Sequence, residues 1–296
     1  MTDIPEELAA TQARYNGEAG RAFIAALPAL ITTFLDRWNL RPDGPPRYGV
    51  CALVLPVVRG HDTRAALKLQ LQDPETTDEP LALRAWAGDG AVRLLDHDPA
   101  TGTMLLERLD AARPLSSHPD TREAARIVAG LLVRLTATRA PRGLRDLGDI
   151  TRALLDRTPK ALARVPYEPV RRLLTDCASA TAEVAADPGD RLLHWDLHYD
   201  NVLASERAPW LAIDPKPLAG DPAFELLPAL LNRFDVDEIL PRFDTMTGEM
   251  SLDRARAAAW TMARALQNAV WATEEGLPPA PENLEIARRL RSTLHS

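Results

Sequence analysis

The sequence predicts an α+β protein with two lobes, a smaller sheet-rich lobe followed by a larger, mainly helical one. In the first third of the chain, apolar residues alternate with polar ones, as in Leu67 and Leu69 around Lys68, which is typical of strands. After Asp110 the apolar residues recur at helical spacing instead. Because strands come first and helices second, we expect two lobes that meet near Glu107 to Ala111.

The predicted division places an N-terminal lobe at residues 1–106, a hinge at 107–111 and a C-terminal lobe at 112–296. The chain has 296 residues, of which 46% are hydrophobic and 26% charged. This composition argues against a disordered, collagen-like or coiled-coil protein. A cleft between two lobes is where a small ligand is expected.

In the N-terminal lobe we expect a helix, then strands in pairs, with a second helix between the pairs. The predicted turns are marked by Gly, Pro and Asp clusters. In chain order these elements are a helix at Glu18–Trp38, strands starting at Trp38–Leu40, at Val50–Val58 and at Ala65–Gln70 with a turn at Arg59–Asp62, a helix at Thr77–Ala87, and strands at Ala91–Leu95 and Thr103–Glu107 around a turn at His97–Pro99.

In the C-terminal lobe, Asp120 and Glu123 form the pattern of a capping box, which predicts a helix start. Asp221 before Pro222 is a second predicted N-cap. The remaining predicted elements are a helix at Pro169–Ala186, a turn at Asp187–Asp190, short strands at Arg191–His194, Asn201–Ala204 and Trp210–Ile213, and helices at Ser251–Glu275 and Pro281–Leu294.

Charge and cysteine content restrict the partners and the compartment. A formal charge of −7 argues against nucleic acid as a partner, because phosphate backbones favour clustered Lys and Arg. An acidic surface suits a cationic small molecule, although it serves solubility equally well. The two distant cysteines, Cys51 and Cys177, are typical of a reduced, cytoplasmic protein without structural zinc. The N-terminus lacks the basic region of a signal peptide.

No membrane partner is expected either. The longest apolar run, Ala22 to Leu35, contains Pro28 and is shorter than the ~20 residues that a bilayer requires. We therefore expect it to form a core or surface helix. The oligomeric state is left open between a monomer and a weak dimer.

The densest cluster of polar chemistry runs from His194 to Asn201, between two short predicted strands. Asp196, Asn201 and Asp214 follow one another in the order that phosphoryl transfer uses: a carboxylate for the acceptor hydroxyl, then two oxygen ligands for magnesium. The kinase catalytic loop has the same form, His-x-Asp-Leu-x-x-x-Asn followed by a metal-binding Asp. The pattern predicts a phosphotransferase.

The runs LLHWDLHYDNVLA and WLAIDPKPLAGDPAFELLPALLNR resemble the family of streptomycin 6-kinases and hydroxyurea phosphotransferases, within the protein-kinase-like phosphotransferases. GDGAVRLL and LLERL are similar to that family too, and the resemblance spans about Trp38 to Trp271. It implies a bilobal protein-kinase-like fold, ATP and Mg²⁺ as cofactors, and a small-molecule acceptor.

The resemblance also implies residue roles. Asp196 would be the catalytic base, Asn201 and Asp214 would bind magnesium, and His194 with His198 would support the catalytic loop. The nucleotide would be bound by the remaining matching positions, which are Lys68 with its helical partner Glu79, the hinge residues Glu107, Arg108 and Leu109, and Lys216, which is expected to be free to approach the γ-phosphate.

One argument for Lys68 does not depend on the family. The 35 basic residues Lys and Arg include only three lysines, Lys68, Lys160 and Lys216. A sequence so biased to arginine is expected to keep a lysine on an inward strand face where a compact ammonium is needed. Chance retention on an exposed strand is the other explanation.

Several residues have a simpler structural interpretation. His194, Asp196 and His198 could suggest zinc or iron, but oxygen ligands nearby favour magnesium. Trp260 and Trp271 lie on one helical face and are expected in the core. Eleven acidic residues against four basic ones between positions 196 and 249 could attract a cationic substrate or could form a solvated surface.

The sequence departs from the wider kinase pattern in three places. Trp195 replaces the usual Arg or Gly, which argues against control by an activation-loop phosphate. Pro215 and Pro217 around Lys216 predict a rigid loop rather than a switch. No Gly-x-Gly-x-x-Gly precedes Lys68; the predicted phosphate loop contains only Gly44 and Gly49.

The predicted reaction is transfer of the ATP γ-phosphate to a hydroxyl of a small polar molecule, with a streptomycin-like aminocyclitol first and hydroxyurea or an amino sugar second. Two alternatives stay open. One is a nucleotide-binding pseudokinase without transfer activity, against which the base, metal ligands and strand lysine argue. The other is a protein kinase, against which the short segment between Asp214 and Asp221 argues.

Overall fold

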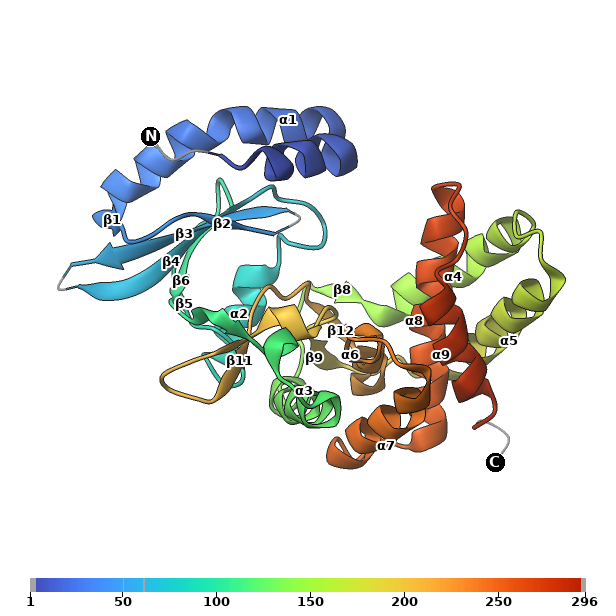
Figure 1. Cartoon of the computed structure of the whole chain (residues 1–296). Coiled ribbons are helices and arrows are strands. Elements are labelled where there is room, and N and C mark those ends of the chain that lie inside the picture. Colours follow the sequence, from blue (N-terminus) through green and yellow to red (C-terminus); the bar gives the residue numbers. More distant parts are fainter. Residues whose placement is uncertain (1–3, 50, 61, 294–296) are drawn as a thin grey trace. The chain divides into compact units, whose positions relative to one another are not determined.

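The structure is a computed structural model that describes residues 4–49, 51–60 and 62–293. The chain divides into two compact units, Met1–Leu109 (unit 1) and Asp110–Ser296 (unit 2). The elements of both units are labelled in Figure 1. Strands dominate unit 1 and helices dominate unit 2, as an α+β chain with strands first should fold.

Unit 1 is built on a sheet with the strand order β1-β3-β4-β6-β5, with β2 also paired to β3. Its described pairings are antiparallel. The mixed β-sheet expected for this lobe is therefore an antiparallel one. β4 lies between β3 and β6, which places Lys68 opposite Val54 and Met104. The strands are β1 (Leu40–Pro42), β2 (Arg47–Tyr48), β3 (Ala52–Arg59), β4 (Thr63–Gln70), β5 (Leu94–Asp98) and β6 (Thr103–Glu107).

One face of this sheet is covered by the helix α1 (Glu6–Arg37), which Figure 1 shows lying along the strands. Its residues Leu27, Ile31 and Phe34 share a core with Leu67 and Leu69 of β4. By length and composition α1 could also cross a membrane. Its apolar residues instead belong to the core of unit 1, in agreement with the expected core or surface helix.

α1 begins twelve residues earlier than predicted because it is two helices joined by a break. Gly17 adopts φ 54° and ψ −123°, which is not helical. A side chain at Gly20 would lie 2.1 Å from the Gln12 carbonyl oxygen, so the two pieces pack closely. The sequence indicated the second piece, at Glu18, but not the first, which contributes only a few buried residues such as Leu8.

Two boundaries in unit 1 differ from the prediction. The strand expected at 91–95 begins at Leu94, and the turn expected at His97 lies after Asp98. The Asp98 carboxylate accepts hydrogen bonds from the backbone and hydroxyl of Thr101, and this fixes the turn two residues later. Val50 and His61, which the predicted strand and turn included, lie outside the described residues. The helix expected near residue 77 is α2 (Glu79–Trp86).

Unit 2 contains two small sheets, with the orders β11-β10-β7 and β8-β12-β9. The three strands predicted here are present, each within one residue of its expected ends. The other three were not predicted. The strands are β7 (Asp110–Pro114), β8 (Arg145–Asp146), β9 (Arg191–Leu193), β10 (Val202–Ala204), β11 (Trp210–Ala212) and β12 (Leu218–Gly220).

The helices of unit 2 begin largely where the sequence indicated. The Asp120 carboxylate accepts from the backbone of Arg122 and Glu123 at the start of α3. α4 and α7 were not predicted, and the described part of α9 ends before Leu294. The helices are α3 (Thr121–Thr136), α4 (Leu147–Leu162), α5 (Glu168–Val184), α6 (Leu226–Leu231), α7 (Ile239–Glu249), α8 (Arg254–Glu274) and α9 (Pro281–Arg291), with short 3-10 helices η1 (Leu115–Ser117), η2 (Tyr199–Asn201), η3 (Pro222–Glu225) and η4 (Val236–Glu238).

The core of unit 2 is centred on α8, which packs against α4, α5 and α9. Trp260 of α8 is fully buried, as expected, while Trp271 is only half-buried. Cys177 on α5 is also fully buried, and burial raises the pKa of its thiol to about 12. Cys51 in unit 1 is half-buried.

The conformation of the loop before β9 depends on Gly189, which has φ +80°. A Cβ at this position would lie 2.8 Å from the backbone of Gly220 and Asp221, at the end of β12. Glycine is therefore required for two reasons: the backbone is left-handed here, and the segment at residues 220–221 of the same chain approaches closely. This contact supports the strand that leads into the catalytic loop.

We expect Gly189→Ala to lower the free energy of unfolding by about 2–4 kcal/mol, because strain and a backbone clash add. The matched control is Gly143→Ala, where φ is +95° but no atom lies within 4 Å of a new Cβ. This control should cost only about 1–2 kcal/mol, from strain alone. Urea denaturation of both variants measures the difference; equal losses would contradict the importance of the close approach.

Candidate active site

In unit 1 two predicted site residues form a buried ion pair. Lys68 lies on β4, on the face opposite Leu67 and Leu69, and its Nζ donates to both carboxylate oxygens of Glu79 at 2.8 and 2.7 Å. Only 4% and 1% of the two side chains are exposed. Glu79 opens α2, where the helix dipole stabilises a carboxylate. Gln70 donates a further hydrogen bond to it, so the ammonium is held at one point of the sheet face.

The three predicted hinge residues lie at the end of β6 or just after it. Glu107 pairs with Arg93 through its backbone N–H and through its carboxylate. The Arg108 guanidinium donates to the Asp43 carboxylate and to the Val57 carbonyl. Leu109 is buried. The side chains of Glu107 and Arg108 are thus occupied in supporting the sheet, and only backbone groups are suited to contact a ligand here.

In unit 2 the catalytic loop, residues 194–201, is joined to the loop at 213–217, which we call the metal loop. The Lys216 backbone N–H donates to the His194 carbonyl at 3.0 Å, and the Ile213 N–H donates to the Asn201 carbonyl at 2.9 Å. His194 Nε2 lies 2.9 Å from the Ile213 carbonyl oxygen. The strands that carry these loops also pair, Leu193 with Leu218 and Val202 with Ala212.

These links bring four predicted residues of unit 2 into one site. Lys216 Nζ lies 2.9 Å from Asp196 Oδ2. The Asn201 side-chain amide donates to the Asp196 carbonyl at 2.9 Å, which leaves its amide oxygen as the group suited to bind a cation. Asp214, with φ +57°, lies between Ile213 and Lys216 and so between both connections to the catalytic loop.

The donor set suits magnesium better than a transition metal. Mg²⁺ is usually bound by one or two protein oxygens plus phosphates and water, which Asn201 and Asp214 can supply. Across residues 4–49, 51–60 and 62–293, no three His, Cys, Asp or Glu residues are grouped to bind a metal. His194, Asp196 and His198 therefore do not form the zinc or iron site that their spacing allowed.

The two histidines of the loop differ in their surroundings. His194 is fully buried, and burial lowers the pKa of its imidazole to about 4, so the ring is neutral at pH 7. Its contact with Ile213 ties the catalytic loop to the metal loop. His198 is half-buried; its backbone N–H donates to the Asp196 carbonyl, and its Nδ1 lies 3.9 Å from Asp200.

The backbone of the catalytic loop is fixed by Glu225, a residue that was not predicted from the sequence. Its Oε1 accepts hydrogen bonds from the backbone N–H groups of His194 and Trp195. Burial raises the pKa of this carboxyl to about 7, against the opposing effect of the two hydrogen bonds. The signal was present: Glu225 is the one charged residue of the sequence between Asp221 and Arg233, inside an apolar run.

Trp195, which departs from the kinase pattern, packs against side chains inside unit 2. It has φ +69°, and the guanidinium carbons of Arg145 and Arg264 lie 4.7 and 4.5 Å from its ring centre. Its ring also meets Phe224 edge-on at 5.9 Å. A cation–π contact contributes about 2 kcal/mol when the arginine is desolvated, as Arg264 is, and less at a more exposed arginine such as Arg145. The side chain therefore fixes the loop from inside rather than contacting a phosphate.

The structure bears on two charge features of the sequence. Lys216, expected to be free to approach the γ-phosphate, is paired with Asp196. The acidic excess between positions 196 and 249 is largely engaged by arginines or by helix starts rather than exposed to a ligand. Its members include Asp221 with Arg256, Glu238 with Arg122, Asp244 with Arg254, Glu249 with Arg126, and Asp235 at the start of η4. The simpler interpretation of this excess is the better one.

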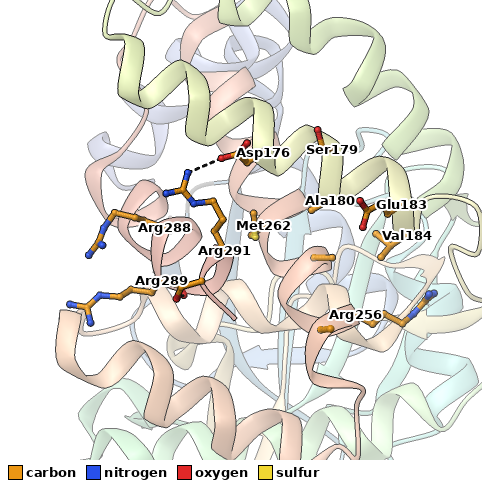
Figure 2. A pocket seen from close by; sticks show the side chains of 13 residues that line it. Asp176, Ser179, Ala180, Glu183, Val184, Arg256, Met262, Arg288, Arg289 and Arg291 are labelled. Carbon is orange, nitrogen blue, oxygen red and sulfur yellow. Dashed lines mark hydrogen bonds and ion pairs between the residues drawn. The ribbon is translucent and has the colours of Figure 1, made fainter. Parts of the chain in front are cut away.

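A groove of about 1030 Å³ lies elsewhere in unit 2, between α5, α8 and α9 (Figure 2). Arginines line it, and they are paired with acids: Arg291 with Asp176 at 2.7 Å and Arg256 with Asp221 at 2.6 Å. None of the site residues predicted from the sequence lines this groove. Its arginines are already paired with acids, and it does not share side chains with the site described above.

Comparison with known proteins identifies the family. A family model described as aminoglycoside/hydroxyurea antibiotic resistance kinase matches residues 37–276. The chain belongs to this family. A hydroxyurea phosphotransferase from Kitasatospora aureofaciens is 58% identical over 289 residues, covering 97% of this chain and 85% of that protein. A streptomycin 6-kinase from Streptomyces glaucescens is 55% identical over 300 residues, covering 98% of both.

The fold of this antibiotic resistance kinase is shared with more distant kinases. A choline/ethanolamine kinase family protein from Mesorhizobium loti superposes with a TM-score of 0.58 at 17% identity, covering 86% of this chain and 89% of that one. The predicted protein-kinase-like fold is confirmed. Membership in the family makes the chain a small-molecule kinase that takes its phosphoryl group from ATP.

The two shifted groups predict an unusual dependence of stability on pH. Glu225 has a folded-state pKa near 7 against 4.5, so the folded state holds an extra proton between these values and stability falls as pH rises. His194 has a pKa near 4 against 6.5, so the unfolded state holds the extra proton and stability rises with pH. Between about pH 4.5 and 6.5 the two contributions offset each other.

We expect Glu225→Gln to remove one of these contributions. Its free energy of unfolding should rise more steeply with pH than that of the parent, by on the order of 2 kcal/mol across the window. Urea denaturation at several pH values measures this, with Glu183→Gln, an exposed glutamate of α5, as the control. Parallel pH profiles for parent and Glu225→Gln would contradict the assignment.

Proposed function

We propose that this kinase phosphorylates a hydroxyl of a streptomycin-like aminoglycoside, with ATP as donor and Mg²⁺ as the metal. The observation that carries the proposal is the arrangement in unit 2. The Asn201 side-chain amide donates to the backbone carbonyl of Asp196, and backbone hydrogen bonds join the loop of Asp214 to the catalytic loop. Two streptomycin 6-kinases, 55% and 51% identical to this chain, support the acceptor class.

In this proposal Asp196 orients the acceptor hydroxyl and receives its proton. The acceptor oxygen bonds to the γ-phosphorus while the bond from that phosphorus to the β–γ bridging oxygen breaks, and ADP leaves. Asn201 and Asp214 would bind Mg²⁺, which neutralises charge on the phosphates when bound. His194 and Glu225 fix the loop, so that Asp196 does not have to be reoriented during the reaction.

Unit 1 would bind the nucleotide. Lys68, held by Glu79, would contact the α- and β-phosphates, and backbone groups at Glu107, Arg108 and Leu109 would reach the adenine. Residues 1–106 then form the nucleotide lobe, 107–111 the hinge, and 112–296 the lobe that supplies the base and the acceptor site. Lys216 would contact the γ-phosphate.

A second acceptor is favoured by a specific observation. The hydroxyurea phosphotransferase is 58% identical to this chain, slightly more than the streptomycin 6-kinases. Hydroxyurea is a small neutral molecule, whereas streptomycin is large and cationic, and the two require different acceptor contacts. A pseudokinase is disfavoured because Lys68, Asp196, Asn201 and Asp214 are all present.

The acceptor is tested by measuring ADP production with streptomycin, hydroxyurea, kanamycin, glucosamine and choline. We expect turnover with streptomycin and little with the others, and mass spectrometry should show one added phosphate. Turnover with hydroxyurea alone would select the second acceptor. ATP consumption with none of the five would contradict the proposed function.

The role of Asp196 is tested by Asp196→Asn, which keeps the size of the side chain and removes its basicity. We expect kcat to fall by about 10²–10⁴, because the acceptor proton loses its destination, while the protein still binds ATP. Steady-state kinetics with the identified acceptor measure the change. Asp149→Asn, at an exposed aspartate of α4, is the control and should leave kcat unaltered. A kcat for Asp196→Asn equal to that of the parent would remove Asp196 from the mechanism.

A further inference from the structure

Hydrogen bonds fix the backbone of Lys216 on both sides. Its N–H donates to the His194 carbonyl at 3.0 Å, and its own carbonyl accepts from Arg145 Nη2 at 3.3 Å. Pro215 and Pro217, both buried, flank it and restrict the chain further. A four-carbon stem therefore carries the ammonium from a fixed base.

The ammonium is paired with the group proposed to be the catalytic base. Lys216 Nζ lies 2.9 Å from Asp196 Oδ2, and the two side chains are 31% and 24% exposed. This exposure distinguishes the pair from Lys68–Glu79, whose exposed fractions are 4% and 1%. A partly exposed ion pair is weak and can open without leaving a buried charge uncompensated, whereas a buried pair cannot.

The contact has a consequence for catalysis. An oxygen of Asp196 that accepts a hydrogen bond from an ammonium is less available to accept one from the acceptor hydroxyl. The Lys216 side chain starts two residues after Asp214, the proposed ligand of the phosphate-bound metal, so a γ-phosphate bound there lies within reach of the same ammonium. A terminal phosphate carries more negative charge than a carboxylate and competes for it.

We propose that Lys216 is an exchangeable counter-ion that moves from Asp196 to a γ-phosphate oxygen when ATP binds, and thereby releases the Asp196 carboxylate for the acceptor hydroxyl. The exchange breaks one ion pair and forms another; no proton and no covalent bond is involved. It rests on the proposed function, and adds that the base becomes available only when the γ-phosphate is in place.

The choice of residue agrees with this role. Lysine is a compact, flexible point charge, whereas arginine binds carboxylates in a fixed two-pronged geometry. The chain has only three lysines. Two of them, Lys68 and Lys216, are proposed to contact phosphates, and each is paired with a carboxylate. The third, Lys160, is exposed on α4.

The exchange is tested by a double-mutant cycle on nucleotide affinity, which needs no acceptor. The four proteins are the parent, Asp196→Asn, Lys216→Met and the double variant, titrated with Mg²⁺ and either ADP or a non-hydrolysable ATP analogue. Because Asp196 competes with the γ-phosphate for Lys216, we expect Asp196→Asn to tighten binding of the analogue about five- to tenfold. In the Lys216→Met background the same change should alter it less than about twofold.

ADP lacks the γ-phosphate and should show no such coupling. Lys160→Met is the matched control and should retain the parent affinities. Lys216→Gln is the second variant if Lys216→Met unfolds. Equal effects of Asp196→Asn in both backgrounds, or the same coupling with ADP, would overturn the exchange.

Failure of the proposed function looks different. A normal cycle without phosphate transfer to streptomycin or hydroxyurea would overturn only the acceptor assignment. Absence of binding by either nucleotide would overturn both.

Discussion

The hydrogen bonds from the backbone of His194 and Trp195 to the buried carboxylate of Glu225 hold the rest of the site in place. Two peptide N–H groups at the head of the catalytic loop would otherwise be buried without partners, which costs several kcal/mol. Within the described residues the second oxygen of Glu225 accepts no hydrogen bond, so the carboxylate itself is only partly compensated. The positive charge of Arg264 opposes its burial cost.

Around this anchor the two functional loops stabilise each other. Trp195 takes a left-handed backbone conformation because Glu225 holds its N–H while Arg145 and Arg264 pack on its ring. His194, next to it, contacts the metal loop through Ile213 and Lys216. The groups proposed to stabilise charge in the transition state are thus positioned by hydrogen bonds that form on folding. Such preorganisation is a main source of rate enhancement in enzymes that transfer phosphoryl groups.

Much of this could be predicted from the sequence, and the exceptions have physical reasons. The order of Asp196, Asn201 and Asp214 indicated the site because chemistry fixes both residue type and spacing. Glu225 was missed because a structural carboxylate has no motif of its own; its only signal was a charge within an apolar run. β8, with two residues, is too short for periodicity, and the first half of α1 buries too few residues to stand out. The pairing of Lys216 depends on a contact across two loops, which sequence order does not specify.

The scarcity of lysines also affects how the protein can be handled. A reagent that acylates amines meets Lys160 on the outer face of α4, a half-buried Lys216 beside Asp196, and a Lys68 shielded by Glu79. Coupling to a dye or a solid support through lysine side chains therefore attaches the molecule at α4 or modifies the reaction centre itself. Attachment through the plentiful surface carboxylates or at an introduced cysteine avoids that choice.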